Sequence, residues 1–213
     1  MGGWRWGSLA WFKVYLQALY LQQIEGIPSM STASHQLHDD IAATLARWEA
    51  EEAAVRQRLA PPGLARPEQL VDKTGLQMFE AISAGELPSV PIGAALGFCP
   101  IEFELGRMVF QGRTDARYMN PLGTIHGGWI ATLLDSAVAC AVHTTLPAGK
   151  GYTTAELKIS YVRALTLQTP LVRAEGKIIN SGRQVGFAEG RLYGPDGRLY
   201  AHATTTCVVL SPR

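Results

Sequence analysis

The spacing of hydrophobic positions changes along the chain, from helical periods in the first half to alternation in the second. From Ser34, which can cap a helix, apolar residues recur every three, four or seven positions until the Pro-Pro-Gly sequence at 61–63. A second, shorter helix is predicted over 67–84, with Gly75 as its weak point. The Gly- and Pro-containing segment 85–91 is predicted to be a loop.

The second half of the chain is predicted to be a sheet packed on one helix. Strand-like residues dominate 98–110, and an apolar helix is expected over 127–143. Alternating segments follow, joined by turns at 180–183 and 194–197; they span 152–162, 170–179, 185–193 and 199–210. The order strand, helix, four strands predicts an antiparallel sheet against a helix, an α+β fold.

The predicted helix carries a single acidic group. Between Gly127 and Val142 the only ionisable carboxylate is Asp135, in a helix that is apolar almost all the way round. A buried carboxylate is unfavourable unless it is hydrogen-bonded, paired or used in chemistry. Asp135 is therefore a candidate catalytic group, and the alternative is an Asp on a narrow exposed stripe.

The start of this helix is a candidate oxyanion site. The sequence His126-Gly127-Gly128 leaves backbone N–H groups accessible at a helix N-terminus, where the helix dipole favours negative charge. The nine residues from His126 to Asp135 span about 13.5 Å along a helix and turn half a revolution beyond two full turns. Asp135 and the His126/Gly127 end of one chain therefore point to opposite sides and lie well apart, whereas two antiparallel copies of the helix could bring them together.

Composition supports burial against a partner. Charged residues are 17% of the 213 residues, below the roughly 25% of an average domain, and hydrophobic residues are 47%. These values exclude a disordered chain and a nucleic-acid-binding tail. The net charge is +1, but residues 30–117 carry −4 and residues 118–213 carry +4, so the C-terminal part could suit an anionic ligand.

The cysteines and histidines do not form a metal or disulfide pattern. Three cysteines without a C-x-x-C motif argue against a disulfide framework and a zinc site, and are read as buried free thiols: Cys99, Cys140 and Cys207. This pattern fits a reducing cytoplasm. The isolated histidines are read as structural or surface residues: His35, His38, His143 and His202.

The first 29 residues differ from the rest of the chain. They are rich in aromatic residues, and their apolar run 9–21 is too short to span a bilayer. Translation starting at Met30, an interfacial or packing helix, and a cleaved targeting segment remain three alternatives.

The segment from Asn120 to Asp135, N-P-L-G-x-x-H-G-G-x-x-x-x-L-L-D, resembles the hotdog-fold acyl-CoA thioesterases. It is most similar to the PaaI-like (phenylacetate-degradation) branch, related to the 4-hydroxybenzoyl-CoA thioesterases, and the resemblance covers about 93–210. It implies a sheet of five or six strands wrapped around one long helix. It also implies homodimers or homotetramers, and thioester hydrolysis without a metal or cofactor.

The resemblance assigns roles by position. Asp135 matches the catalytic carboxylate, and Gly127 matches the glycine whose N–H polarises the thioester carbonyl, with Gly128 next to it as a substrate-binding position. His126 would orient the loop or the thioester, and Asn120 would help hold the nucleophilic water or the carbonyl. The carboxylate is either a general base or a nucleophile that forms a mixed anhydride.

Two further assignments are weaker. Thr154 falls where a hydroxyl positions the water or the carboxylate, but a register slip of one residue would exchange it with Thr153. Basic residues that could bind the coenzyme A phosphates, or could equally lie on a solvated strand face, are Arg163, Arg173, Lys177 and Arg183.

The sequence therefore predicts a hydrolase that cleaves acyl-CoA, with aryl or medium-chain acyl groups preferred. The alternative is a non-catalytic acyl-CoA-binding or sensing hotdog protein. The expected organisation is an aromatic-rich segment 1–29, a helical extension 30–92 and a hotdog domain 93–213. The expected partners are the substrate and further copies of the chain, with no nucleic acid and no transmembrane segment.

Overall fold

The computed structural model describes residues 30–211, with side chains from residue 36 onward. The chain divides into two compact units, residues 1–42 and 43–213. In the first unit, the described residues 30–42 are helical and belong to α2 (Met30–Arg58). The helix starts at Met30, so the predicted start at Ser34 is wrong. The three alternatives for residues 1–29 concern residues outside the described part.

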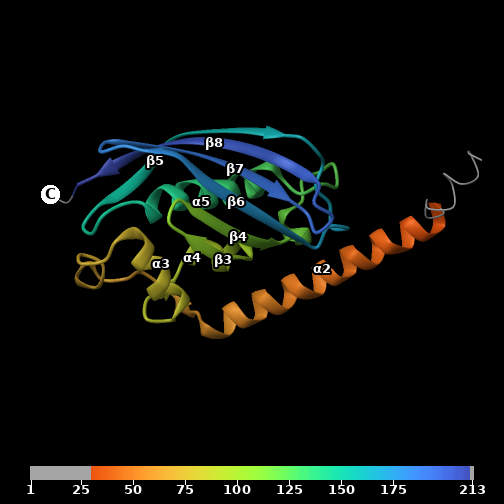
Figure 1. Ribbon diagram of the computed structural model, residues 1–213, viewed down its shortest axis with the longest axis horizontal. Helices are drawn as coiled ribbons and strands as arrows, with labels where there is room; N and C mark the ends of the chain where they lie inside the picture. The colour runs from red at the N-terminus through yellow and green to blue at the C-terminus, as the bar shows by residue number, and fades with distance from the viewer. Residues whose placement is uncertain (1–29, 212–213) are drawn as a thin grey trace, which may run out of the picture. The chain divides into compact units, whose positions relative to one another are not determined.

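The second unit is built on a six-stranded antiparallel sheet with the strand order β3-β4-β6-β7-β8-β5. Its strands are β3 (Phe98–Glu104), β4 (Arg107–Arg113), β5 (Gly151–Tyr161), β6 (Leu171–Ser181), β7 (Val185–Tyr193) and β8 (Leu199–Leu210). Helix α5 (Gly127–Thr144) lies along one face of this curved sheet (Figure 1). The predicted α+β class, the apolar helix and the four C-terminal strands are confirmed.

The core lies between α5 and the sheet. Leu133, Leu134 and Ala137 are fully buried on the helix, and Val172 and Ala174 are fully buried on β6. The approach is close enough that a Cβ on Gly176 of β6 would lie 2.2 Å from the Ala137 carbonyl oxygen. Glycine is therefore required where α5 crosses the strand.

The predicted strand 98–110 is a hairpin of two strands. The chain turns at Leu105 and Gly106, and Gly106 has a positive φ of 79°. The Gly106 N–H donates a hydrogen bond of 2.8 Å to Thr144 Oγ1 at the end of α5. The short turn contains a single glycine between two apolar runs and does not interrupt the hydrophobic pattern. For this reason the pattern predicted one strand instead of two.

The predicted helix 67–84 is also divided. A 3₁₀ turn, η1 (Pro67–Gln69), precedes α3 (Gly75–Ser83). Thr74 caps α3, because its side chain accepts the Gln77 N–H while the Gln77 side chain accepts the Thr74 N–H. Gly75 is thus the first residue of a helix and not a weak point within one.

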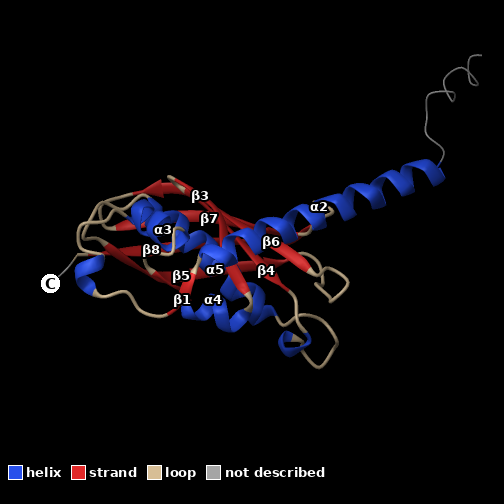
Figure 2. Ribbon diagram, turned by 90° about the horizontal axis from the view of Figure 1, so that it is seen from below, coloured by secondary structure: helices blue, strands red, loops and turns tan. Residues whose placement is uncertain are grey.

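The segment 85–91, predicted as a loop, contains short ordered elements. Strand β2 (Pro88–Ser89) pairs in parallel with β1 (Ala60–Pro62), and α4 (Pro91–Leu96) follows at once. Proline at its first turn favours α4, and the left-handed conformation of Gly97 ends it. Figure 2 shows α3 and α4 as short blue helices beside the red strands of the sheet.

Residues 43–58 of α2 cover the sheet face opposite α5. Trp48 is buried and lies 4.4 Å from the Arg173 guanidinium in a cation–π contact. Gln111 donates to buried Glu52 at 3.1 Å, and Arg173 donates to Gln111 at 2.9 Å. Arg173 was expected to contact coenzyme A phosphates or to lie on a solvated strand face. The structure instead buries it under residues 43–58 of α2, where it pairs with Glu51 and Glu102.

Among the helices in the described residues, none is long and apolar enough to cross a membrane.

We predict that Gly176→Ala lowers the free energy of unfolding by at least about 2 kcal/mol, because the added methyl group overpacks the helix–sheet contact. Gly151→Ala is the matched control, since a Cβ there would have its nearest neighbour at 4.0 Å. Urea denaturation of both variants measures the difference. Equal midpoints for the two variants would show that the close approach at Gly176 carries no packing constraint.

Candidate active site

The N-terminus of α5 presents one backbone donor to the surface. His126 is the N-cap residue, and its Nδ1 accepts a hydrogen bond of 2.9 Å from the Gly128 N–H. The N–H of Gly128, proposed from sequence as a substrate contact, is therefore occupied. For the Gly127 N–H, no acceptor is recorded among residues 36–211. The role of His126 is thus to fix the first turn so that the Gly127 N–H remains available.

Asn120 organises the loop before this helix. Its Oδ1 accepts the N–H groups of Leu122 at 2.9 Å and Thr124 at 3.2 Å, and its Nδ2 donates to Thr124 Oγ1 at 2.8 Å. Most of the amide is thus committed to its own loop. Asn120 lies beside Gly127 in one hollow of about 290 Å³, so it remains positioned near the helix start.

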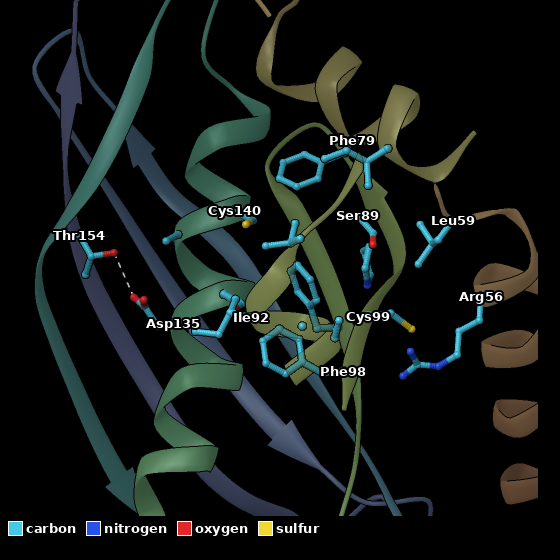
Figure 3. A pocket seen from close by; sticks show the side chains of 18 of the residues that line it. Arg56, Leu59, Phe79, Ser89, Ile92, Phe98, Cys99, Asp135, Cys140 and Thr154 are labelled. Atoms are coloured by element: carbon cyan, nitrogen blue, oxygen red, sulfur yellow. Dashed lines mark hydrogen bonds between the residues drawn. The ribbon is translucent and has the colours of Figure 1, made fainter. Parts of the chain in front are cut away.

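The structure distinguishes Thr154 from Thr153. The pairing of β5 with β8 shifts at Ala155, so a bulge separates Thr154 from Glu156. The bulge places Thr154 on the same face as Leu157, and Thr153 is exposed. Thr154 Oγ1 donates a hydrogen bond of 3.0 Å to Asp135 Oδ1 (Figure 3). Strict alternation would have placed Thr154 on the outer face.

Burial raises the pKa of the Asp135 carboxyl, and the hydrogen bond from Thr154 partly opposes that shift. The carboxylate borders a cavity of about 230 Å³ between α5 and the two edge strands of the sheet, β5 and β3. The apolar part of the lining includes Phe79, Ile82, Ile92, Phe98, Phe110 and Ala139. Asp135 thus provides an accessible carboxylate next to an apolar binding space.

Within one chain, the two halves of the predicted site lie in different hollows. The cavity at Asp135 shares no lining residue with the hollow that contains Asn120 and Gly127. Because Asp135 lies eight residues, about 12 Å, along α5 from Gly127, a single chain does not present both groups to one substrate atom.

The predicted basic contacts separate as well. Arg163 lines the hollow with Asn120 and Gly127. Arg183 lies in the turn between β6 and β7, and the neighbouring Ser181 contacts Thr145, which follows the C-terminal end of α5. Arg183 is therefore at the opposite end of the helix from Gly127. Lys177 pairs with Glu175 at 3.3 Å.

The cysteines are free, and burial raises the pKa of Cys99 to about 11 and that of Cys140 to about 12. Both remain neutral thiols at physiological pH. Burial lowers the pKa of His143 to about 4, and its ring packs between Phe79 and Tyr152. Among the side chains of residues 36–211, no group of three His, Cys, Asp or Glu is placed to hold a metal ion.

The side of the cavity away from Asp135 is formed by residues that no sequence motif indicated. Arg56 and Leu59 reach it from the end of α2, Phe79 from α3, and Ile92 from α4. Figure 3 shows Arg56 beyond Cys99, on the side of the cavity away from Asp135. These residues lie far from the motif in sequence, and only the folded chain brings them to it.

Residues 122–201 match the family model of the thioesterase superfamily. This segment is therefore similar to members of that superfamily. The match contains Gly127, Asp135 and Thr154, the residues that the structure places at the helix start and at the carboxylate.

Solved structures share the fold. One is a protein from Ralstonia eutropha described as an inferred thioesterase related to phenylacetic acid degradation; it is 29% identical, with a TM-score of 0.57, covering 61% of this chain and 98% of that chain. Another is a point mutant of the phenylacetic acid degradation protein PaaI from Thermus thermophilus, 28% identical with a TM-score of 0.50, covering 55% of this chain and 97% of that chain. The expected hotdog fold and PaaI-like resemblance are confirmed.

A curated relative is a Caenorhabditis elegans protein described as an inferred esterase, 30% identical over 90 residues, or 42% of this chain. The chain spans about half the length of this relative, 52%.

We predict that Asp135→Asn becomes more stable relative to the unchanged protein as the pH rises from about 4 to 7. The folded-state pKa of Asp135 is raised above its unfolded value, so the unchanged protein loses stability as the pH rises from the unfolded to the folded pKa and the loss persists above it, whereas the asparagine does not titrate. Melting temperatures across this pH range measure the effect, with the exposed Asp72→Asn as control. If the difference in melting temperature between Asp135→Asn and the unchanged protein became smaller as the pH rises, burial would not be raising the pKa of Asp135.

Proposed function

We propose that the protein is a thioester hydrolase that cleaves acyl-CoA to a free acid and coenzyme A, at two sites shared between the protomers of a homodimer. The observation that carries this proposal is Asp135, a carboxylate with a raised pKa beside an apolar cavity, on a helix whose N-terminus presents the Gly127 N–H. The match of residues 122–201 to the thioesterase superfamily supports the reaction.

The edge strand β5 supports the dimer. It is 11 residues long, and within the described residues its outer edge has no paired strand. A long open edge is a surface on which a second strand can pair. Two residues of β5 contact the two halves of the site. Thr154 contacts Asp135, and the Tyr161 hydroxyl donates a hydrogen bond of 2.9 Å to the Gly127 carbonyl at the start of α5.

Antiparallel pairing of two β5 strands can therefore join the two halves of the site. If Thr154 of one protomer lies opposite Tyr161 of the other, the two-fold axis passes near Leu157 and Lys158. Asp135 of each protomer then approaches Gly127 of its partner, twice per dimer. Such a dimer would bring together two hollows that lie apart within one chain.

The geometry supports a simple division of roles. The thioester carbonyl oxygen accepts the Gly127 N–H, which stabilises the negative charge that develops on that oxygen. Thr154 holds one oxygen of the ionised Asp135 carboxylate of the other protomer in place. As a general base, Asp135 takes a proton from water while the water oxygen attacks the carbonyl carbon, and the C–S bond breaks so that coenzyme A leaves as the thiolate. As a nucleophile, Asp135 attacks the carbonyl carbon itself and the same thiolate leaves, after which water hydrolyses the mixed anhydride to the free acid and restores the carboxylate.

Arg163 is the basic residue that we propose to contact the coenzyme A moiety. It lines the hollow with Gly127, where a cation can attract an anionic substrate. Gly128 contributes through its hydrogen bond to His126, and Arg183 is too distant from this hollow to support the role expected for it. The preference for aryl or medium-chain groups, the tetramer, the cytoplasmic location and the division at residue 93 stay predictions.

We expect Asp135→Asn to lower kcat/KM for acyl-CoA hydrolysis at least about a hundredfold, because it removes the base or nucleophile. Thiol release from a panel of acyl-CoA substrates measures the rate, and gel filtration and circular dichroism verify the dimer and fold. Asp72→Asn is the matched control. Undiminished hydrolysis by Asp135→Asn would exclude Asp135 as the catalytic group, and acyl-CoA binding without turnover in the unchanged protein would favour the sensing alternative.

Mixing two inactive chains tests the shared site. Asp135→Asn and Gly127→Pro chains, refolded together, should recover one active site per heterodimer, about half the activity of an unchanged dimer. Proline is compatible with the first helical position, because His126 already has a ψ of 135°. Its ring requires a small shift of the half-exposed Tyr161, whose ring lies 3.1 Å from a Cβ at Gly127.

Isolated heterodimers carrying two different affinity tags give the decisive measurement. Heterodimers as inactive as the two parent variants would contradict a site composed of Asp135 and Gly127 from different chains. The combined Asp135→Asn, Gly127→Pro chain mixed with the unchanged chain is the control, since both sites of that heterodimer lack one group.

A further inference from the structure

A second hollow continues the cavity that begins at Asp135. It has a volume of about 500 Å³ and is more open to solvent. The first cavity is bordered by Asp135 and Ala139 of α5, and the second hollow by His143. These three residues are four positions apart and therefore form one row along the helix. The two spaces thus follow the same face of α5, away from the proposed reaction centre.

Tyr152 of β5 is the residue that lines both spaces. Beside it, Phe79 of the first space packs on His143 of the second, with ring centroids 5.5 Å apart. The Tyr152 hydroxyl contacts Cys140 Sγ at 3.6 Å on the side of the first cavity, and its ring lies 4.9 Å from the His143 ring on the side of the second. Tyr152 is thereby fixed from both directions across the path between the two spaces.

The second hollow has the chemistry of an apolar ligand site. Most of its lining is apolar and comes from the segment before α3 and from α3 itself, with Ala65, Pro67, Leu70, Val71 and Met78. His143 at the boundary is neutral at physiological pH, because burial lowers its pKa to about 4. No catalytic role in the proposed reaction requires this hollow.

We propose that Tyr152 sets the acyl length that the protein accepts, and that the hollow beyond it is a subsite for the distal methylene groups of a longer acyl chain. This inference rests on the proposed hydrolysis of acyl thioesters. With Tyr152 in place, the acyl group must fit the first cavity of about 230 Å³. An apolar cavity of roughly 150 Å³ holds benzene, so this space suits aryl or short acyl groups.

Removal of the tyrosine ring should shift the preference toward longer chains. Each methylene group buried in the opened subsite is worth a factor of about four in affinity. The ratio of kcat/KM for dodecanoyl-CoA to that for hexanoyl-CoA should rise at least about tenfold in Tyr152→Ala, when both substrates are kept below their micelle concentrations. Tyr152→Leu is a second variant that retains an apolar side chain in the core.

Tyr152→Phe is the matched control. It removes the contact with Cys140 but keeps the ring between the two spaces, so the ratio should stay as in the unchanged protein. A ratio that rises equally in Tyr152→Phe would assign the effect to the hydroxyl and overturn the proposal. Unchanged ratios in both Tyr152→Ala and Tyr152→Leu, with the fold verified by circular dichroism, would also overturn it.

Binding of free fatty acids distinguishes this inference from the proposed function. Calorimetric titration with hexanoate and dodecanoate measures binding and needs no turnover. Tyr152→Ala should bind dodecanoate more tightly than the unchanged protein does, and Tyr152→Phe should not. If the unchanged protein hydrolyses no thioester, the proposed function fails, while the titration still decides the length limit. Dodecanoate binding to the unchanged protein as tight as to Tyr152→Ala would show that Tyr152 does not block the path.

Discussion

The structure depends on keeping one carboxylate ionisable inside an apolar contact. Asp135 sits on a helix that the sheet surrounds, and burial raises its pKa. An unpaired, fully buried carboxylate would instead become neutral, since the free energy of desolvating a charge is large. Two features keep the carboxylate of Asp135 ionisable. Thr154 donates a hydrogen bond to it, and a cavity borders it, so that it is not fully enclosed by apolar side chains. The bulge at Ala155 is needed for the first of these, because it turns Thr154 inward.

The residues before β3 complete the surroundings of this carboxylate. Helices α3 and α4 and the end of α2 close the gap between the two edge strands of the sheet, so that Asp135 faces an enclosed apolar space. The network of Trp48, Glu52, Gln111 and Arg173 fixes residues 43–58 of α2 on the opposite face of the sheet, and every buried side-chain polar atom in the described residues has a hydrogen-bond partner. The chain outside the superfamily match thus shapes the cavity at Asp135 without supplying the carboxylate or the helix N-terminus.

Sequence reasoning succeeded where a local pattern repeats. The alternation over β6, β7 and β8 and the apolar length of α5 each contain enough residues to define a period, and their bounds agree with the structure within two residues. It failed where a single residue interrupts a pattern. Gly106 divides one predicted strand into a hairpin, and Thr74 begins a helix that the apolar spacing had extended to Pro67. Burial of Arg173 was not predicted, because the polar side of an alternating strand indicates exposure to solvent unless another element covers it.

The sequence by itself determined the α+β class, the resemblance to the hotdog thioesterases, and the candidate groups Asp135, Gly127 and His126, because each depends on residues close together in the chain. It also determined that Asp135 and the His126/Gly127 end of the helix lie well apart, since the rise along a helix is fixed by the number of residues. Only the tertiary structure decided between Thr153 and Thr154, showed that His126 occupies the Gly128 N–H, and joined Arg56, Phe79 and Ile92 to the cavity. Strand register and the meeting of distant segments arise from packing across the sheet, and no local pattern encodes them.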